Sequence, residues 1–348
     1  MILDDPARLA RLDAHDVRSI LAAFPEHCRA AAALRAQPAL TVRRPRVVIV
    51  AGMGGSAAGG DCLAACAADQ VEVPVLVHRG YGLPGVARGD ALVIAASYSG
   101  ETEEVVSAAE TALERGLPLV VMTTGGRLAA LASARGCPLV TLPGGLMPRM
   151  ALAYLFLPAL TLLADAGVPV ATASEITETI GVVSELASAL APARPASANE
   201  AKRLALAIGD RMPALYGGPL TAAVAYRWKT DFAENAKTLA LAGSVPEMNH
   251  NEIEAWHGHA ACDLYAVLLR DPEESPAIAR RFALLGEMMG PVAGGVGECW
   301  ARGKARAARL LGLAYVGQWT SYYLAIVRGI DPWAVPIIED FKRRMNAP

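Results

Sequence analysis

The sequence predicts an α/β protein of two three-layer αβα domains, each a parallel sheet flanked by helices. Three observations predict this fold. The chain has 348 residues, 53% hydrophobic and 19% charged, which is long enough and apolar enough for two ordinary cores. Between residues 46 and 142, five short apolar runs alternate with helical stretches, as they do in βαβ units. A second βα pattern begins at residue 213 and echoes the first.

The composition excludes several classes of protein. The formal net charge of −2 gives no bulk attraction to nucleic acid or to an anionic membrane, so neither is expected as a partner. The longest apolar run, residues 150–164, has 15 residues, whereas a bilayer span needs about 20. The N-terminus lacks the basic end and apolar core of a signal peptide. The six cysteines show no Cys-x-x-Cys pair, so a reducing cytoplasmic location is expected.

The chain divides into three parts on composition. Residues 1–170 are expected to form the first domain, with a helical lead-in over residues 1–40 that carries no chemistry. Residues 171–200 are rich in serine and alanine, contain Pro192 and Pro195, and are expected to contain the linker. Residues 201–348 are expected to form the second domain.

A turn rich in hydroxyl groups follows the strand expected at residues 91–96. A helix is expected directly after it, with acidic residues in the first turn, where the helix dipole favours them. A strand that delivers hydroxyl groups to a helix N-terminus forms an anion pocket, because unpaired N–H groups and the dipole both face the ligand. The alternative is a serine-rich turn that only caps its helix. The expected phosphate ligands are Ser97, Ser99 and Thr102, with Gly100 permitting close approach.

A glycine-rich turn follows the strand expected at residues 47–51 and comes close to the dinucleotide fingerprint Gly-x-Gly-x-x-Ala. In a dinucleotide site an acidic residue after the second strand binds a ribose, but here a histidine and an arginine follow that strand, so no cofactor is expected. The carboxyl ends of parallel strands share one edge of a sheet. We therefore expect the N–H groups of Gly54 and Gly55 and the hydroxyl of Ser56 to lie beside the later serines.

Arg149 is the only charged residue between Arg135 and Asp165, and it stands at the head of a long apolar helix. A cation is unfavourable at a helix N-terminus because the dipole is positive there. Arg149 is either a surface arginine or a ligand for an anion, and its unfavourable position favours the second interpretation.

The second half repeats the pattern of the first with one omission. Residues 213–223 echo residues 48–58, with an apolar strand, two glycines, a hydroxyl and paired alanines entering a helix. The strand expected at residues 264–269 takes the place of the one at 91–96 but ends at Arg270 without a serine cluster. The sequence thus predicts a diverged duplication in which only the first copy keeps the phosphate pocket.

The helix expected at about residues 220–237 carries a candidate general base, Glu234, after two apolar residues. A carboxylate held against apolar surface keeps its proton more readily, which suits a base that works near neutral pH. The alternative is a solvated carboxylate paired with Lys237 or Lys229.

The stretch from Asn249 to His259 concentrates three of the six histidines. His257-x-His259 beside carboxylates suggests a zinc site, but no His-Glu-x-x-His pattern or cysteine partner supports one, so no metal is expected. Asn249 and Glu252 instead predict a capping box that opens a short helix, with His250 exposed on its first turn.

Five short motifs together resemble the bifunctional phosphoglucose/phosphomannose isomerase family, which is built from two sugar isomerase domains. They occur in the family's order from about residue 45 onward, and five in order are specific. The motifs are Gly52-Met53-Gly54-Gly55-Ser56, Ser97-Tyr98-Ser99-Gly100-Glu101-Thr102, Pro148-Arg149-Met150-Ala151, Phe232-Ala233-Glu234-Asn235-Ala236-Lys237 and Asn249-His250-Asn251-Glu252.

The end of the chain, residues 331–342, also resembles the family's terminal segment, whose lysine reaches the active site, and Lys342 is the matching residue. The alternative is a surface lysine in a basic tail. Some family members carry a threonine shortly before this lysine, tied to use of the mannose epimer. No threonine stands between Trp333 and Phe341, so activity on mannose 6-phosphate is less secure.

The resemblance implies metal-independent aldose–ketose isomerisation of a hexose 6-phosphate, with no cofactor. Glucose 6-phosphate, mannose 6-phosphate or both would give fructose 6-phosphate through a cis-enediol. It implies that Glu234 is the base, that His250 helped by Lys342 opens the ring, and that Arg149 stabilises the enediolate. In related isomerases the histidine comes from the neighbouring subunit, which implies a homodimer with His250 contributed across the interface. The alternative function is a non-catalytic regulatory protein that binds sugar phosphates.

Overall fold

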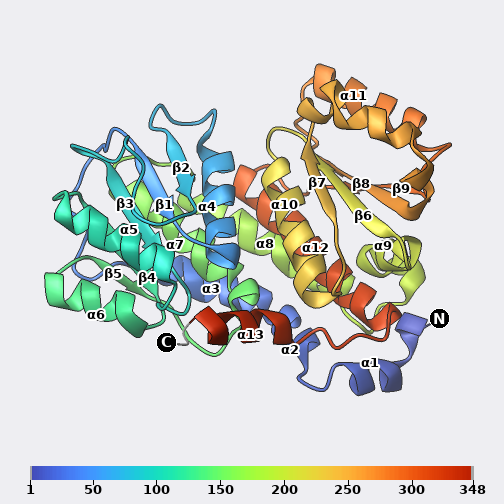
Figure 1. Cartoon of the computed structure of the whole chain (residues 1–348), viewed down its shortest axis with the longest axis horizontal. Helices are drawn as coiled ribbons and strands as arrows, with labels where there is room; N and C mark the ends of the chain where they lie inside the picture. The colour runs from blue at the N-terminus through green and yellow to red at the C-terminus, as the bar shows by residue number, and fades with distance from the viewer. Residues whose placement is uncertain (1, 346–348) are drawn as a thin grey trace.

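The computed structural model describes residues 2–345, apart from the side chains of residues 259 and 260. It contains two parallel β-sheets with helices on both faces of each (Figure 1). The larger sheet has the strand order β2-β1-β3-β4-β5 and the smaller sheet has the order β7-β6-β8-β9. The predicted α/β class is therefore confirmed. The strands are β1 (Val48–Ala51), β2 (Val75–His78), β3 (Leu92–Ala96), β4 (Leu119–Thr123), β5 (Leu139–Thr141), β6 (Met212–Gly217), β7 (Leu241–Ser244), β8 (Leu264–Arg270) and β9 (Val296–Trp300).

The helices follow the strands in the βαβ pattern that the sequence predicts. Each of the central strands β1, β3 and β4 is buried along its whole length, which is typical of a parallel sheet covered on both faces. The helices are α1 (Pro6–Leu12), α2 (Val17–Ala22), α3 (Phe24–Ala33), α4 (Gly54–Ala67), α5 (Glu103–Glu114), α6 (Gly126–Arg135), α7 (Leu152–Asp165), α8 (Ala173–Leu190), α9 (Glu200–Ile208), α10 (Ala222–Asn235), α11 (Pro276–Met289), α12 (Arg306–Val327) and α13 (Pro336–Met345).

The two sheets share their inner helical layers. Alternate residues of β1 and β3 pack on opposite sides, one set against α5 and α6 and the other against α4 and α7. The second set belongs to the same hydrophobic core as α9, α10 and α12 and the inner face of the smaller sheet, and as α8, which packs against α12 and α3. The outer face of the smaller sheet packs against α11. One continuous core thus joins the two halves, with α8 and α12 between the sheets in Figure 1.

Some elements differ from the expectations. The strands β7 and β9 were not predicted, because Leu-Ala-Gly-Ser and Val-Gly-Glu-Cys-Trp lack a continuous apolar run and lie at the two edges of the sheet. Residues 171–200, expected to contain the linker, are mostly the helix α8, which begins with a capping box of Thr172 and Glu175. The lead-in forms α1, α2 and α3 and is tied to α12, since Tyr315 and Tyr322 donate hydrogen bonds to it.

Within residues 2–345, no helix is long and apolar enough to cross a lipid bilayer. The longest apolar stretch of the sequence forms α7, which is buried against α3 and α4.

Candidate active site

Hydroxyl groups gather at the carboxyl edge of the larger sheet, where the neighbouring strands β1 and β3 end. Ser97 is the first residue after β3, and its Oγ lies 2.8 Å from Thr102 Oγ1 and 3.5 Å from Ser99 Oγ. Ser56, in the first turn of α4, accepts a hydrogen bond from the main-chain N–H of Tyr98 at 3.2 Å. The structure thus brings Ser56 into contact with the turn that carries the other three. These four residues are referred to below as the hydroxyl cluster.

Two helices begin at the hydroxyl cluster. The first N–H groups of a helix lack partners within it, and no side-chain cap satisfies them at the start of α4 (Gly54) or of α5 (Glu103). The helix dipole adds partial positive charge at the same place. Ser99 Oγ accepts the N–H of Glu101 at 3.3 Å, which leaves its hydroxyl proton for another acceptor. This arrangement can hold a phosphate group with N–H and O–H donors.

The glycines at the start of α4 have a steric reason. Gly54 has φ +51°, a left-handed conformation that favours glycine. A Cβ on Gly55 would lie 2.7 Å from the carbonyl oxygen of Pro148 and 3.4 Å from the Cα of Arg149. Only glycine therefore lets the short 3₁₀ helix Pro148–Met150 pack against the N-terminus of α4. The contact places Arg149 directly beside the glycine-rich turn.

The side chain of Arg149 crosses from the first half to the second. It is only 2% exposed, and its Nε donates to Asn235 Oδ1 at 2.8 Å. Its Nη1 lies 3.5 Å from Glu234 Oε2, and its Nη2 donates to the carbonyl oxygens of Pro332 and Trp333 at 3.0 and 2.6 Å. Burial lowers the pKa of Arg149 from its ordinary value, and the nearby Glu234 opposes that shift.

The position of Arg149 explains the electrostatic conflict noted in the sequence. The residue precedes the N-terminus of α7, but its guanidinium lies at the C-terminus of α10, where the helix dipole is negative and favours a cation. Lys237 occupies the same helix end, and its Nζ donates to the carbonyl oxygens of Glu234 at 2.7 Å and of Asp331 at 3.0 Å. Burial lowers the pKa of Lys237, with Arg149 as a further cause.

Glu234 lies in the last turn of α10 with its side chain 25% exposed. Its carboxylate faces Arg149 rather than either of the two lysines that the sequence offered as partners. Lys237 bonds main-chain carbonyl groups, and the ammonium group of Lys229 lies 5.3 Å from the ring centre of Tyr226. A carboxylate that is partly open to solvent and oriented by an arginine has the access that a general base needs.

His250 and Lys342 have no bond to the other predicted site residues within residues 2–345. Both side chains are exposed, His250 at the end of a 3₁₀ helix after β7 and Lys342 on α13. Within residues 2–345, no hydrogen bond or ion pair joins either of them to the hydroxyl cluster, Arg149 or Glu234. A chain of contacts therefore links eight of the ten predicted site residues, and within residues 2–345 no hydrogen bond or ion pair adds the other two. The eight are Gly54, Gly55, Ser56, Ser97, Ser99, Thr102, Arg149 and Glu234.

The capping box predicted at Asn249 does not form. Asn251 is the N-cap of the short helix Glu252–His257, and its Oδ1 accepts the N–H of Glu252 at 2.6 Å. Asn249 Oδ1 instead accepts a hydrogen bond from Arg281 of α11. The prediction was wrong because the chain makes two consecutive 3₁₀ helices here, which moves the cap two residues along.

Sequence reasoning missed several groups around Arg149. Asn235, a member of the resembling motif, binds the guanidinium and also donates to Ser321 Oγ at 2.9 Å. Arg227 and Asp231 form a buried ion pair at 2.7 Å on α10, and their i,i+4 spacing was a visible signal. The carbonyl oxygens of residues 332 and 333 had no signal, because main-chain acceptors are independent of side-chain identity.

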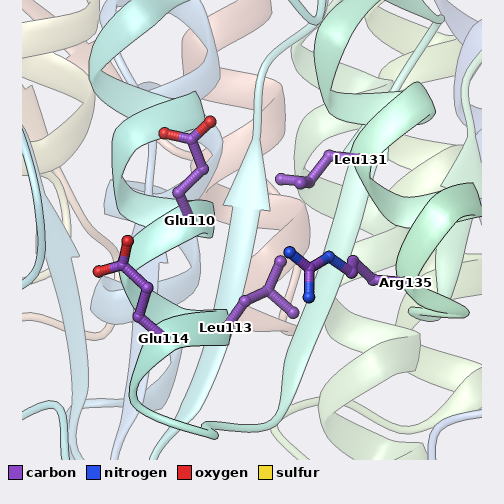
Figure 2. A pocket seen from close by; sticks show the side chains of 5 residues that line it. All are labelled: Glu110, Leu113, Glu114, Leu131 and Arg135. Atoms are coloured by element: carbon purple, nitrogen blue, oxygen red, sulfur yellow. The ribbon is translucent and has the colours of Figure 1, made fainter.

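Two further places within the described residues were candidates for a site. Among the described residues, no three His, Cys, Asp or Glu side chains come together as a metal site, and the side chain of His259 lies outside the described residues. A pocket of about 340 Å³ lies between the C-terminal parts of α5 and α6, as Figure 2 shows. Because the hydroxyl cluster lies at the start of α5, this pocket is at the opposite edge of the sheet. The lining residues are Glu110, Leu113, Glu114, Leu131 and Arg135.

Comparisons with known proteins agree with this architecture. The model of the bacterial phospho-glucose isomerase C-terminal SIS domain matches residues 197–345. The chain is 37% identical to the bifunctional phosphoglucose/phosphomannose isomerase of Caldicellulosiruptor bescii, over 86% of this chain and 89% of that protein. It is 33% identical to the protein of the same name from Thermoplasma acidophilum, with the same two coverages.

Solved structures show the same fold. A glucose-6-phosphate isomerase like protein from Thermus thermophilus superposes with a TM-score of 0.62 at 22% identity, over 95% of this chain and 96% of that one. The C-terminal domain of glucosamine-fructose-6-phosphate aminotransferase from Francisella tularensis gives a TM-score of 0.67 at 15% identity, over 90% and 96%. At these identities the likeness is one of fold alone.

Proposed function

The chain belongs to the bifunctional phosphoglucose/phosphomannose isomerase family, and from that premise we propose that it converts glucose 6-phosphate to fructose 6-phosphate through a cis-enediol. Mannose 6-phosphate is the proposed second aldose, since both epimers give the same enediol. The proposal depends chiefly on the two contacts of Arg149. Its backbone packs against Gly55 in the glycine-rich turn after β1, and its guanidinium lies 3.5 Å from the carboxylate of Glu234. In a hexose phosphate bound there, the phosphate would contact the first half of the chain and the reacting carbons would contact Glu234 of the second half.

The proposed phosphate site consists of the hydroxyl cluster and the N–H groups of Gly54 and Gly55. Binding of the phosphate at this remote point holds the sugar in register and supplies binding energy for the reacting end. The absence of a side-chain cap on α4 and α5 supports this role, because a phosphate would satisfy the free N–H groups.

Glu234 is the proposed base that takes the proton from C2 and returns it to C1. The enediolate that forms carries negative charge on oxygen, and the guanidinium of Arg149 is already in place to stabilise it. Since the base and the arginine handle both the proton and the charge, we propose that the reaction requires no metal ion.

Ring opening is assigned to His250, helped by Lys342. Because both are exposed and neither has a hydrogen bond or ion pair to Glu234 within residues 2–345, we propose that a second copy of the chain brings its own His250 into the site of a homodimer. Exposed apolar side chains beside the edge strands β2 and β7 support an interface there. They are Leu76, Tyr81, Tyr226, Leu239 and Leu241. The proposed domains are residues 1–170 and 201–348, joined through residues 171–200.

The test is a coupled assay that offers glucose, mannose and fructose 6-phosphates, with and without a chelator. Turnover that persists with the chelator is the expected result. Binding of sugar phosphates without turnover would contradict the proposal and favour the regulatory alternative.

A subunit-mixing experiment tests the shared site. Glu234→Gln and His250→Ala are each expected to be nearly inactive, but a random mixture of the two should recover about a quarter of the wild-type activity, because half of the dimers then contain one intact site. No recovery in a mixture shown to exchange subunits would contradict the contribution of His250 across the interface.

A further inference from the structure

A charged row lies on the buried face of α10, where sequence reasoning assigned no role. Arg227 and Asp231 stand one turn apart, Nη2 of the first lies 2.7 Å from Oδ1 of the second, and both residues are 1% exposed. Asn235 follows one turn later on the same face, beside Glu234. The row therefore leads from the middle of α10 to the residues that contact Arg149.

Arg227 also reaches the backbone of Arg149. Its Nη2 donates a short hydrogen bond to the carbonyl oxygen of Arg149, which accepts a second bond from Gln318 Nε2 of α12 at 3.4 Å. Arg149 is thus fixed at both ends. Its main-chain oxygen is held by two buried side chains, and its guanidinium by the end of α10 and two carbonyl groups.

This double attachment leaves little freedom in the guanidinium. An arginine side chain has five N–H donors, and four of them have protein acceptors here, one on Nε, one on Nη1 and two on Nη2. The remaining Nη1 donor is the one left for a ligand next to Glu234. A donor fixed in advance stabilises a developing charge without reorganisation, so its position matters to the rate.

We propose that Arg227 and Asp231 are positioning residues of the isomerisation, which hold the backbone of Arg149 so that its free N–H and the carboxylate of Glu234 meet the same part of the substrate. This inference rests on the proposed function. Neither residue touches the substrate, and both act through Arg149.

Stability alone is a poor explanation for this pair. A buried Arg–Asp pair loses the hydration of both ions, and well-packed apolar residues of similar volume are often as stable. The pair is also imperfectly bonded, because Arg227 Nε and both oxygens of Asp231 lack well-aligned hydrogen bonds. Burial raises the pKa of Asp231 to about 7, with Arg227 opposing the shift and Glu234 adding to it. The groups that face the pair are Arg149, Glu234 and, beside Arg227, the thiol of Cys62 on α4.

The chain offers a matched control. Asp271 and Arg309 form a second ion pair of the same chemistry at 2.8 Å, with side chains 10% and 8% exposed. This pair joins the end of β8 to the start of α12 and has no bond to Arg149. Asp231→Asn and Asp271→Asn each replace the carboxyl partner of a buried arginine by an amide, and only the first of these pairs is bonded to Arg149.

The experiment measures kcat, KM, the pH profile and thermal unfolding for both variants with glucose 6-phosphate. For Asp231→Asn we expect kcat to fall by about 10- to 100-fold with KM within about twofold, as for a small misplacement of catalytic groups. The pH profile of kcat should also change near pH 7, because burial raises the pKa of Asp231 to about 7 and asparagine does not titrate. Asp271→Asn should lower the unfolding temperature and leave kcat and the pH profile unchanged.

Gln318→Met and a double variant test the same positioning role by other routes, in case Asp231→Asn folds poorly. Gln318→Met removes the second donor to the Arg149 carbonyl with an apolar side chain of similar size, and kcat should fall severalfold. In a Glu234→Gln background, Asp231→Asn should cost much less than in the wild type, because residues that act as a unit are not additive.

The outcomes separate this inference from the proposed function. A wild-type protein without isomerase activity removes the proposed function itself. A wild type that is active, with Asp231→Asn and Gln318→Met folded and matching it in kcat and pH profile, overturns the positioning role and leaves the proposed function intact. Equal losses of kcat in Asp231→Asn and Asp271→Asn would also overturn it, since the loss would then follow from stability.

Discussion

The carboxyl ends of β3 and β8 occupy equivalent places in the two sheets but carry opposite chemistry. After β3 the chain presents hydroxyl groups and a helix whose N-terminus has no side-chain cap. The last residue of β8 is Arg270, whose guanidinium carbon lies 4.8 Å from the ring centre of Phe282 and 4.3 Å from that of Trp300. Glu274 and Glu298 pair with this arginine. At the carboxyl end of β8, ion pairs of the protein itself thus take the place of the hydroxyl groups found after β3.

The equivalent helices differ as well. α4 follows β1 and offers its N-terminus to the proposed phosphate, whereas α10 follows β6 and offers its C-terminal end, where Glu234 and Asn235 meet Arg149. One hydrogen-bond connection is similar in the two halves. Ser56 joins α4 to the turn after β3, and Thr221 joins α10 to β8 by donating to the carbonyl oxygen of Leu269 at 2.6 Å. The two halves share a strand order and differ in the chemistry of their loops, and one fold can serve several functions in this way.

The largest expected effect tests the claim that the second half does the chemistry. Glu234→Gln should lower kcat by about 10²–10⁴-fold with little change in KM, as the loss of a general base does. Steady-state kinetics with glucose 6-phosphate measures both constants, and Glu273→Gln, an exposed carboxylate of the same half, is the control. Near-normal turnover would place the base elsewhere.

The next effect tests phosphate binding by the first half. Ser99→Ala combined with Thr102→Ala should weaken inhibition by inorganic phosphate by about 10²- to 10⁴-fold, because each of the two lost hydrogen bonds to a charged group is worth about 1.5–3 kcal/mol. Ser133→Ala, on the exposed side of α6, should leave the inhibition constant unchanged. An unchanged constant in the double variant would refute the pocket.

A third variant tests whether Arg270 and its ion pairs at the end of β8 have only a structural role. Arg270→Met breaks ion pairs with Glu274 and Glu298, and removal of one partner of a buried pair costs about 3 kcal/mol of unfolding free energy. Chemical denaturation measures that loss. We expect KM for glucose 6-phosphate to stay at the wild-type value, and a tenfold rise would mean that the second half also binds phosphate.

The smallest effect concerns the pH dependence of stability. Asp231 has a pKa raised by burial to about 7 from an ordinary value of 3.8, so its protonated form is the one that the folded state prefers. Its contribution to stability is therefore complete below about pH 4 and is lost as the pH rises through about 7. The unfolding free energy of the wild type relative to Asp231→Asn should fall over that range in urea titrations. A difference that is constant from pH 4 to 8 would contradict the shift.

The sequence was a good guide to elements that depend on local pattern. The buried strands β1, β3 and β4 could be predicted because an uninterrupted apolar run between turn signals has few other stable conformations. The edge strands β7 and β9 could not, since an edge strand is half exposed and tolerates glycine and charge. The helix cap was predicted at Asn249 but is formed by Asn251. The two could not be told apart because both are asparagine, which is a good N-cap residue.

For the site, the chemistry of the groups could be predicted from the residues and their place along the chain. The hydroxyls of Ser97 and Ser99 follow a strand, and Arg149 precedes an apolar helix. Which of these groups meet depends on the packing of the whole molecule. The contact of Arg149 with Glu234, the carbonyl groups of residues 332 and 333, and the hold of Arg227 on the Arg149 backbone join positions between 78 and 184 residues apart. Such pairings follow from how two sheets pack through a shared core, and no local pattern encodes them.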